Sequence, residues 1–253
     1  MPLIPGAEPL SHDGGPIGVL VIHGFTSSPK SMRPWAEHLV EAGFTVEMPR
    51  LPGHGTTWQD MSVTRWEDWY AEVDRVLTSL LSRCEQVFVM GLSMGGSLAL
   101  RLAERRGADI AGIVLVNPAV HTERKEAVLL PVLRHLVKAF PGIRNDIKKP
   151  GVDEGAYEKM PLQCFYSLQS AWKDIRADIR SVTVPVVLLR SREDHVVEPS
   201  NAAWILANVA STDVTEVVLE NSYHVATIDH DAELIFTTSV DFVHRVAGSA
   251  AQA

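Results

Sequence analysis

Residues 87–102 constrain the fold of this chain most strongly, because they place a strand, a tight turn and a helix one after another. Val87-Phe88-Val89-Met90 is a short apolar run of the kind found in strands buried on both faces. It leads into Gly91-Leu92-Ser93-Met94-Gly95, and residues 96–102 favour a helix. In this setting Gly-x-Ser-x-Gly is typical of a sharp strand-to-helix turn that strains the serine backbone and exposes its hydroxyl.

Short apolar runs alternate with helix-length amphipathic segments along the chain. This pattern predicts an α/β fold in which a mostly parallel central sheet is flanked by helices. The runs expected to form strands are residues 18–22, 44–48, 87–90, 113–116, 184–189 and 214–219. Two apolar stripes predict helices packed on the sheet; one comprises Trp66, Trp69, Val73, Val76, Leu77 and Leu80, and the other Ile235, Phe236, Ser239, Val240, Val243 and Val246.

A chain of 253 residues can bury one large core, so we expect a single domain, residues 1–253. Residues 120–172 interrupt the alternation, with leucines at helical spacing, then prolines and glycines, and no clear strand. A connection of this length inside a tight alternation is usually functional. We therefore expect an inserted helical cap at residues 120–172, whose apolar stripe fits a lid over a pocket and plain packing equally well.

Charge and composition exclude several classes of protein. With 23 Lys and Arg against 31 Asp and Glu, the net charge is −8, and no basic run could follow a phosphate backbone. Nucleic acid is therefore not an expected partner. No apolar run approaches the roughly 20 residues that span a bilayer, and the first residues do not form a signal peptide, so we expect no integral membrane segment and a cytoplasmic location. The sequence leaves the oligomeric state open.

The two cysteines, Cys84 and Cys164, lack the spacing of metal ligands and cannot form a disulfide framework. We expect two free thiols and no metal.

Residues that could activate Ser93 follow two later strands. Serine is a weak nucleophile at neutral pH and needs a base within hydrogen-bond reach, together with a group that orients the base. Asp194 comes shortly after the expected strand 184–189, and His224 after the strand 214–219. Because parallel strands carry their functional loops at the same edge of the sheet, we expect Ser93, Asp194 and His224 to meet there as nucleophile, orienting acid and base.

Each partner of Ser93 has an alternative. Glu193 is the alternative to Asp194, because a glutamate can also orient a histidine. His195 and His230 are the alternatives to His224. However, His195 would have to bend back on its neighbour Asp194, and His230 leads into the last helix.

Acyl transfer also requires donors for the negatively charged oxygen of the tetrahedral intermediate. Such donors are backbone N–H groups, one from the residue after the nucleophile and one from the loop after an early strand. These positions predict an oxyanion hole formed by Met94 and by Phe25, the latter in His23-Gly24-Phe25. His23 and His54 each lie beside glycine and are expected to brace the backbone by hydrogen bonding.

Five motifs together resemble the compact bacterial carboxylesterases and monoacylglycerol lipases. They are His23-Gly24-Phe25, Pro49-Arg50-Leu51-Pro52-Gly53-His54-Gly55, Gly91-Leu92-Ser93-Met94-Gly95-Gly96, Glu193-Asp194-His195-Val196-Val197 and Ser222-Tyr223-His224-Val225. The resemblance covers residues 6–246 and is weakest in the cap. It implies an α/β-hydrolase fold, a triad of Ser93, Asp194 and His224, an oxyanion hole at Phe25 and Met94, a small lid over an acyl pocket, and no cofactor.

The same resemblance suggests where a substrate would be bound. In the bacterial monoacylglycerol lipases a cap carboxylate near an Ala-Tyr-Glu-Lys segment holds the glycerol head. Residues 156–159 match that segment, and Glu154 is the implied counterpart. Apolar residues of the cap could wall a narrow acyl pocket, with Ile147 as a further substrate-binding candidate; the set is Leu129, Leu133, Phe140, Ile143, Ile147, Phe165 and Tyr166.

The sequence thus predicts a serine esterase that hydrolyses carboxylic esters with one acyl chain, as a carboxylesterase or monoacylglycerol lipase, through an acyl-enzyme intermediate. Its expected partner is a small-molecule ester or monoacylglycerol. A thioesterase, a carbon–carbon hydrolase or a perhydrolase on the same fold is the first alternative, since fold and triad do not choose the leaving group. A non-enzymatic small-molecule receptor is the second, although a receptor would be free to lose His224 or Asp194.

Overall fold

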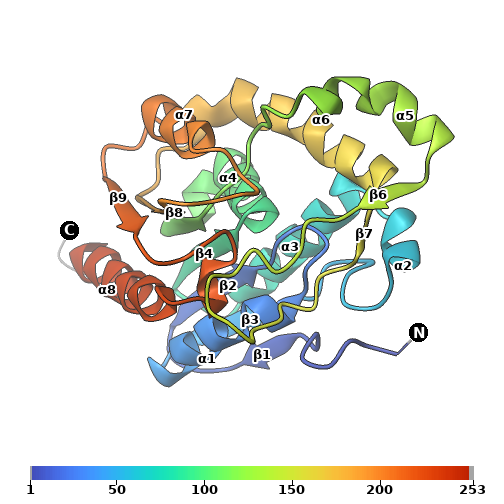
Figure 1. Ribbon diagram of the computed structural model, residues 1–253. Coiled ribbons are helices and arrows are strands. Elements are labelled where there is room, and N and C mark those ends of the chain that lie inside the picture. The colour runs from blue at the N-terminus through green and yellow to red at the C-terminus, as the bar shows by residue number, and fades with distance from the viewer. Residues whose placement is uncertain (1, 251–253) are drawn as a thin grey trace.

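The computed structural model describes residues 2–250, and its centre is a seven-stranded sheet in the order β1-β3-β2-β4-β5-β8-β9 (Figure 1). All neighbouring strands are parallel except β1, which runs antiparallel to β3 at one edge. The strands are β1 (Leu10–His12), β2 (Ile17–Ile22), β3 (Thr45–Met48), β4 (Gln86–Leu92), β5 (Gly112–Val116), β8 (Val186–Ser191) and β9 (Val214–Leu219). The prediction of a mostly parallel sheet flanked by helices is confirmed.

Residues alternate along each central strand between two apolar clusters. In β2, for example, Leu20 and Ile22 belong to one cluster, whereas Val19 and Val21 belong to the other. Because successive side chains of a strand point to opposite faces, this alternation shows that both faces of the sheet are covered. Continuous apolar runs in the sequence therefore predicted these strands correctly.

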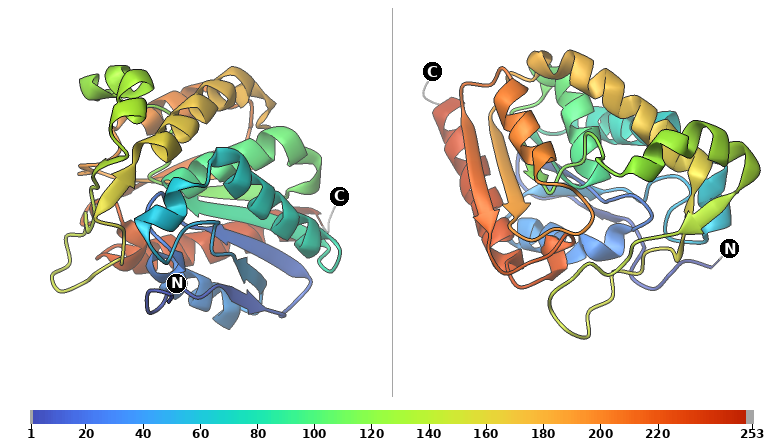
Figure 2. Two further views of the ribbon diagram at one scale, coloured as in Figure 1. Left: turned by 90° about the vertical axis from the view of Figure 1, so that its right-hand side faces the viewer. Right: turned by 45° about the horizontal axis from the view of Figure 1, so that its top comes forward.

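Helices pack on each face of the sheet, as Figure 2 shows in its left view. One face carries α1 (Arg33–Glu41) and α8 (Ala232–Ala250), which pack against each other and against the sheet. The opposite face carries α3 (Trp66–Leu81) and α4 (Met94–Arg106), with α6 (Leu162–Asp178) packed on both. All six residues of the predicted stripe in α3 are buried, as expected for a helix facing the core.

The remaining elements are short or lie at the ends of the sheet. They are α2 (Trp58–Ser62), α7 (Ser200–Asn208) and the single-turn helices η1 (Pro29–Ser31), η2 (Gly107–Asp109), η4 (Ile179–Ser181) and η5 (Ala226–Ile228). Among residues 2–250, no helix combines the length and the apolar composition that crossing a membrane requires.

Strand ends differ from the prediction by one or two residues, and one strand of the sheet was not predicted. The strand expected at residues 184–189 begins at Val186, because Pro185 has no N–H to donate to a ladder. The edge strand β1 was not predicted. It has only three residues, one apolar, and it exists because it pairs with β3.

Residues 120–172, which we call the insertion, lie within the connection between β5 and β8. This connection contains η3 (Lys125–Leu129), α5 (Leu130–Leu136), β6 (Ala139–Pro141), β7 (Lys159–Pro161) and α6, which runs on to Asp178. The expectation of no strand here was wrong, since β6 and β7 form a separate two-stranded sheet. A three-residue strand is too short to show a hydrophobic pattern in the sequence. These two strands form because they pair with each other, although many residues separate them along the chain.

Candidate active site

Ser93 occupies the turn between β4 and α4 and has a left-handed backbone conformation, with φ of 56°. For a residue other than glycine this conformation is strained. The turn is also crowded. A Cβ atom on Gly91 would lie 2.3 Å from the Gly95 carbonyl carbon, and one on Gly95 would lie 2.1 Å from the Ile22 carbonyl oxygen. Both flanking positions therefore require glycine, and together they present the serine at the carboxyl end of the sheet.

His224 and Asp194 meet at the same edge, as the strand order led us to expect. His224 Nδ1 lies 2.8 Å from Asp194 Oδ2, and both side chains are almost completely buried. The other carboxylate oxygen, Oδ1, accepts hydrogen bonds from the backbone N–H groups of Val196 and Val197, each at 2.8 Å. Asp194 is thus held on both oxygens, with one of them directed at the imidazole.

The charges of this pair stabilise each other. Burial raises the pKa of Asp194, but the charge and hydrogen bond of His224 and the two backbone N–H groups outweigh burial, and the net pKa is lowered. Burial lowers the pKa of His224, whereas the charges of Asp194, Glu154 and Asp146 and the hydrogen bond to Asp194 raise it, for a net increase. An imidazolium formed at His224 is therefore favoured by its surroundings.

The alternatives to this pair lie in other environments. Glu193 is half exposed, and its carboxylate lies 3.7 Å from Lys148 Nζ and 3.6 Å from His195 Nε2. His195 is also half exposed and places Nδ1 2.7 Å from Asp146 Oδ1. Neither residue lines the cavity in front of Ser93.

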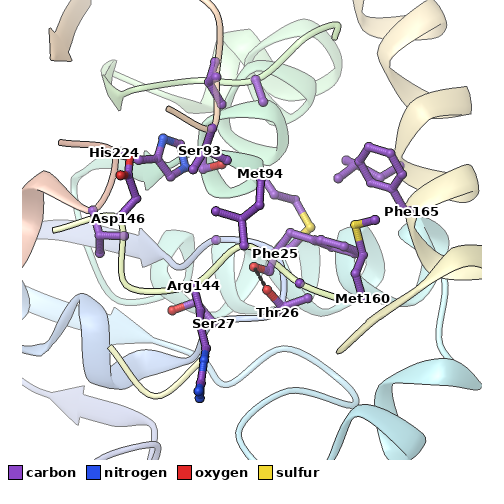
Figure 3. A pocket seen from close by; sticks show the side chains of 18 of the residues that line it. Phe25, Thr26, Ser27, Ser93, Met94, Arg144, Asp146, Met160, Phe165 and His224 are labelled. Carbon is purple, nitrogen blue, oxygen red and sulfur yellow. Dashed lines mark hydrogen bonds between the residues drawn. The ribbon is translucent and has the colours of Figure 1, made fainter. Parts of the chain in front are cut away.

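That cavity has a volume of about 210 Å³ and is lined mainly by apolar side chains. Ser93 and His224 lie together at one end of it, and Phe165 and Met160 lie at the other (Figure 3). Phe165, Leu168 and Trp172 all come from one face of α6. The site can therefore take an apolar chain that extends from the serine towards α6.

Phe25 and Met94 also line the cavity, next to the serine. Met94 is the first residue of α4, so its N–H has no partner within the helix. Phe25 follows β2, and the Phe25 ring packs against Trp69 and Phe165, with centroids 5.7 and 5.9 Å away. Both residues thus contribute an apolar side chain to the wall.

His23 and His54 brace the backbone, in agreement with the expectation. His23 Nε2 accepts the N–H of Leu51 at 3.2 Å, and Nδ1 lies 2.9 Å from the Gly24 carbonyl oxygen. Burial lowers the pKa of His23 to about 4 and that of His54 well below its usual value. Both imidazoles are therefore neutral at physiological pH and fix the loops beside the serine.

Glu154 lies in the wall of the cavity and is 5% exposed. Its Oε1 accepts the N–H of Asn145 at 2.7 Å, and burial raises the pKa of the carboxyl group. A buried carboxylate facing a cavity can bind hydroxyl groups of a ligand.

The predicted apolar wall needs correction. Of the seven insertion residues proposed, only Ile143 and Phe165 line the cavity, together with Met160, Leu168 and Trp172, which were not proposed. Ile147 does not line it and packs instead against the core on the α1 and α8 side. Leu129, at the end of η3, and Leu136, at the end of α5, are 59% and 75% exposed, so neither faces the cavity.

Sequence reasoning also missed two residues that contact the main chain of His224. Asn117 follows β5 directly and donates from Nδ2 to the His224 carbonyl oxygen at 2.8 Å. A polar residue at the carboxyl end of a predicted strand was the available signal. Asp146 accepts the N–H of His224 at 3.1 Å, and no sequence pattern pointed to it.

Residues 2–250 contain no group of three His, Cys, Asp or Glu residues suited to a metal ion.

Comparisons with known proteins agree on one family. A family model described as serine aminopeptidase, S33, matches residues 17–231. The chain is 43% identical over 247 residues to a thermostable monoacylglycerol lipase of Bacillus sp. strain H-257, covering 98% of each protein. It is 28% identical to a carboxylesterase of Bacillus subtilis, covering 94% of this chain and 97% of that protein. A solved structure of metagenome-derived lipolytic enzymes, LipS and LipT, superposes with a TM-score of 0.94 at 41% identity, covering 96% of this chain and 100% of the other.

Proposed function

The chain is an ester hydrolase that belongs to the serine aminopeptidase S33 family, and on this premise we propose that it cleaves esters carrying one acyl chain, with monoacylglycerols as the preferred class. The observation that carries the proposal is the buried His224–Asp194 pair beside the strained Ser93, at one end of a narrow apolar cavity. A non-enzymatic receptor would not require a nucleophile, a base and an orienting acid at its binding site.

The proposed reaction has two steps. The Ser93 hydroxyl attacks the ester carbonyl carbon while His224 takes its proton, and the carbonyl electrons move onto oxygen. The N–H groups of Phe25 and Met94 stabilise that oxygen. The tetrahedral intermediate then collapses, the alcohol leaves with the proton from His224, and Ser93 remains acylated.

Water completes the cycle by the same route. His224 removes a proton from a water molecule, which attacks the acyl-enzyme carbonyl, and the carboxylic acid leaves as Ser93 regains its proton. Asp194 keeps His224 in the required orientation and stabilises the imidazolium without itself becoming protonated.

The size and composition of the cavity support the choice of substrate. About 210 Å³ accommodates a single chain of moderate length, and its walls from α6 are apolar. Each buried methylene contributes roughly 0.8 kcal/mol. The specificity constant should therefore rise with acyl length until the cavity is full and then fall.

Glu154 provides the proposed preference for a glycerol leaving group, because its buried carboxylate can accept hydrogen bonds from the two free hydroxyls. Glu154→Gln should then raise KM for a monoacylglycerol more than for the methyl ester of the same fatty acid. Equal effects on the KM values of the two substrates would show that Glu154 supports the fold and does not bind the glycerol hydroxyls.

The decisive experiment is a rate profile over monoacylglycerols and aryl esters of increasing chain length, with a triacylglycerol emulsion as the comparison. We expect efficient cleavage of single-chain esters and poor cleavage of the emulsion. Turnover of triolein as fast as monoolein, with a jump in rate at the oil–water interface, would contradict the narrow-cavity interpretation.

A further inference from the structure

The main chain of His224 is held from two opposite sides by residues distant in sequence. On the side of the core, Asn117 Nδ2 donates to the His224 carbonyl oxygen at 2.8 Å. On the side of the insertion, Asp146 Oδ2 accepts the His224 N–H at 3.1 Å. With Asp194 bound to Nδ1, the residue is fixed at three points, and one of them comes from the insertion.

Asp146 joins two loops of the site as well as holding one residue. Its Oδ2 also accepts the N–H of His195 at 3.2 Å, and its Oδ1 lies 2.7 Å from His195 Nδ1. His195 is the immediate neighbour of Asp194. One carboxylate therefore ties the loop after β8, which carries the acid, to the loop after β9, which carries the base.

The backbone around Asp146 adds to this attachment. The Asp146 carbonyl oxygen accepts the N–H of Val225 at 3.1 Å. Four residues after Val225, Asp229 accepts the N–H groups of Lys148 and Tyr223 on one oxygen, at 2.7 and 2.9 Å. Asp229 is 3% exposed, so these bonds are shielded from water. Residues 146–148 of the insertion thus lie bonded along residues 223–225.

The core side of His224 is held by a second set of hydrogen bonds. Asn117 is buried, and its Oδ1 accepts the N–H of Ser191 at 2.7 Å. Ser191 Oγ in turn donates to the Tyr223 carbonyl oxygen at 2.8 Å. These bonds connect the ends of β5 and β8 to the histidine loop. The insertion supplies the other part of the support, through Asp146.

We propose that Asp146 is a positioning residue for the base, so that His224 is held in its working place only while residues 145–149 of the insertion are docked against it. The inference rests on the proposed ester hydrolase function. Asp146 acts through His224 and the loop of Asp194, since its two oxygens are already bound to the main chain of His224 and to His195. Any movement of the insertion that admits substrate must then leave these residues in place and occur elsewhere, as in α5, where Val132 and Leu136 are exposed.

The proposal separates catalysis from binding in a measurable way. Removing the carboxylate should loosen the base and lower kcat. Asp146 also lines the cavity, but both of its oxygens are bound to the protein, so KM for a small aryl ester should change little. A misplacement of the reacting groups by about 1 Å can cost on the order of 100-fold in rate. We expect Asp146→Ala to lower kcat by about 10- to 100-fold, and Asp146→Asn, which retains one oxygen acceptor, to recover part of the loss.

Two further measurements exclude a merely structural role. The rate of labelling of Ser93 by a small organophosphonate should fall in parallel with kcat, because labelling needs the same base. The acid limb of kcat/KM should move to lower pH in Asp146→Asn, since the carboxylates facing His224 are Asp194, Glu154 and Asp146 and one charge is removed. Glu126→Gln, which alters an exposed carboxylate of the insertion, is the matched control and should behave as the wild type.

The outcomes are distinguishable. If Asp146→Ala does not fold, the kcat and pH profile of Asp146→Asn provide the test. An unchanged melting temperature of Asp146→Asn shows that this variant is folded. Wild-type kcat, labelling rate and pH profile in a folded Asp146 variant would overturn the positioning role, as would an effect confined to KM. A wild-type protein that neither hydrolyses esters nor reacts with the phosphonate would instead refute the proposed function on which the inference rests.

Discussion

His224 and Asp194 form a buried pair in which Nδ1 and Oδ2 are 2.8 Å apart, and their side chains are only 8% and 5% exposed. Such burial would penalise two isolated charges. The pair persists because each group stabilises the charged form of the other, and because Asp194 also accepts two backbone N–H groups. The arrangement is suited to a base that must become positively charged during each step.

The first prediction concerns the acid of this pair. Asp194→Asn should lower kcat by roughly 10³- to 10⁴-fold, because the amide no longer fixes the tautomer of His224 or stabilises its charge. Since Asp194 raises the pKa of His224, the acid limb of the residual activity should lie at lower pH than in the wild type. Steady-state rates between about pH 5 and pH 9 test both points.

Glu193→Gln is the matched control for this prediction. Its side chain is 54% exposed and contacts Lys148 and His195. Activity should therefore stay close to that of the wild type. If Glu193→Gln lost its activity and Asp194→Asn kept most of it, the orienting acid would be Glu193 and not Asp194.

The second prediction concerns the nucleophile. Ser93→Ala should reduce kcat by on the order of 10⁴-fold or more and leave the fold intact, because one hydroxyl contributes little to stability. An organophosphonate should attach to Ser93 in the wild type and leave the variant unmodified. Mapping of the adduct by mass spectrometry to any other residue would refute the assignment.

The same residue provides a test of cooperation. Ser93, His224 and Asp194 are expected to act as one unit, so their effects should not add. The double variant Ser93→Ala/His224→Ala should be no slower than the worse single variant. Additive losses would mean that the histidine serves a step that does not involve the serine.

The third prediction concerns the turn that carries Ser93. A Cβ atom on Gly95 would lie 2.1 Å from the Ile22 carbonyl oxygen, which is backbone and cannot move without displacing the loop of Phe25. Gly95→Ala should therefore destabilise the fold by about 1–3 kcal/mol or more and reduce kcat. Urea unfolding monitored together with activity measures both effects.

Gly248 offers a glycine control in another helix. It lies in α8, and a Cβ atom there would meet no atom within 4 Å. Gly248→Ala should leave activity unchanged and keep or raise stability by up to about 1 kcal/mol, since alanine favours a helix. Equal destabilisation at both positions would show that contact with Ile22 is not the cause.

The sequence predicted the sheet and the candidate site for a common reason. Buried parallel strands are continuous apolar runs, and the residues after them at one sheet edge must lie close together. Ser93, Asp194 and His224 follow three such strands, and the structure brings the last two into contact. The strands β1, β6 and β7 were not predicted, because they have three residues each and depend on pairing with distant segments.

The insertion was harder to predict, because spacing along a helix does not say which face meets the cavity. The cavity-lining face of α6 comprises Phe165, Leu168 and Trp172, whereas the exposed leucines lie in α5 or at its N-terminal end. The contact between Asp146 and His224 spans 78 residues. No periodicity encodes such a contact, and only the path of the folded chain creates it.

The last prediction concerns stability and lies outside the site. Glu104 on α4 has a side chain that is 1% exposed, and its Oε2 lies 2.7 Å from Arg101 Nη1. Arg101 is shared with Asp178, at 2.8 Å. Burial raises the pKa of Glu104 more than Arg101 lowers it, so that the net value is about 7.

A raised pKa for an acid means that the folded state favours its protonated form. The resulting stabilisation is fully present below the unfolded value of 4.5 and is lost as the pH rises through about 7. Glu104→Gln replaces the acid by a neutral side chain of the same shape and should remove this dependence. The melting temperature of the variant relative to the wild type should therefore increase between about pH 5 and pH 8.5, by roughly 5 °C or more.

Glu72→Gln is the comparison, because Glu72 forms a surface ion pair with Arg75 on α3 and such pairs contribute little. Its melting temperature should differ from the wild type by a similar small amount at both pH values. If Glu104→Gln behaved in the same way, Glu104 would have to be ionised across the whole range, with Arg101 fully compensating its burial. A melting temperature of Glu104→Gln that falls relative to the wild type as the pH rises would show that the ion pair outweighs the cost of burying the charge.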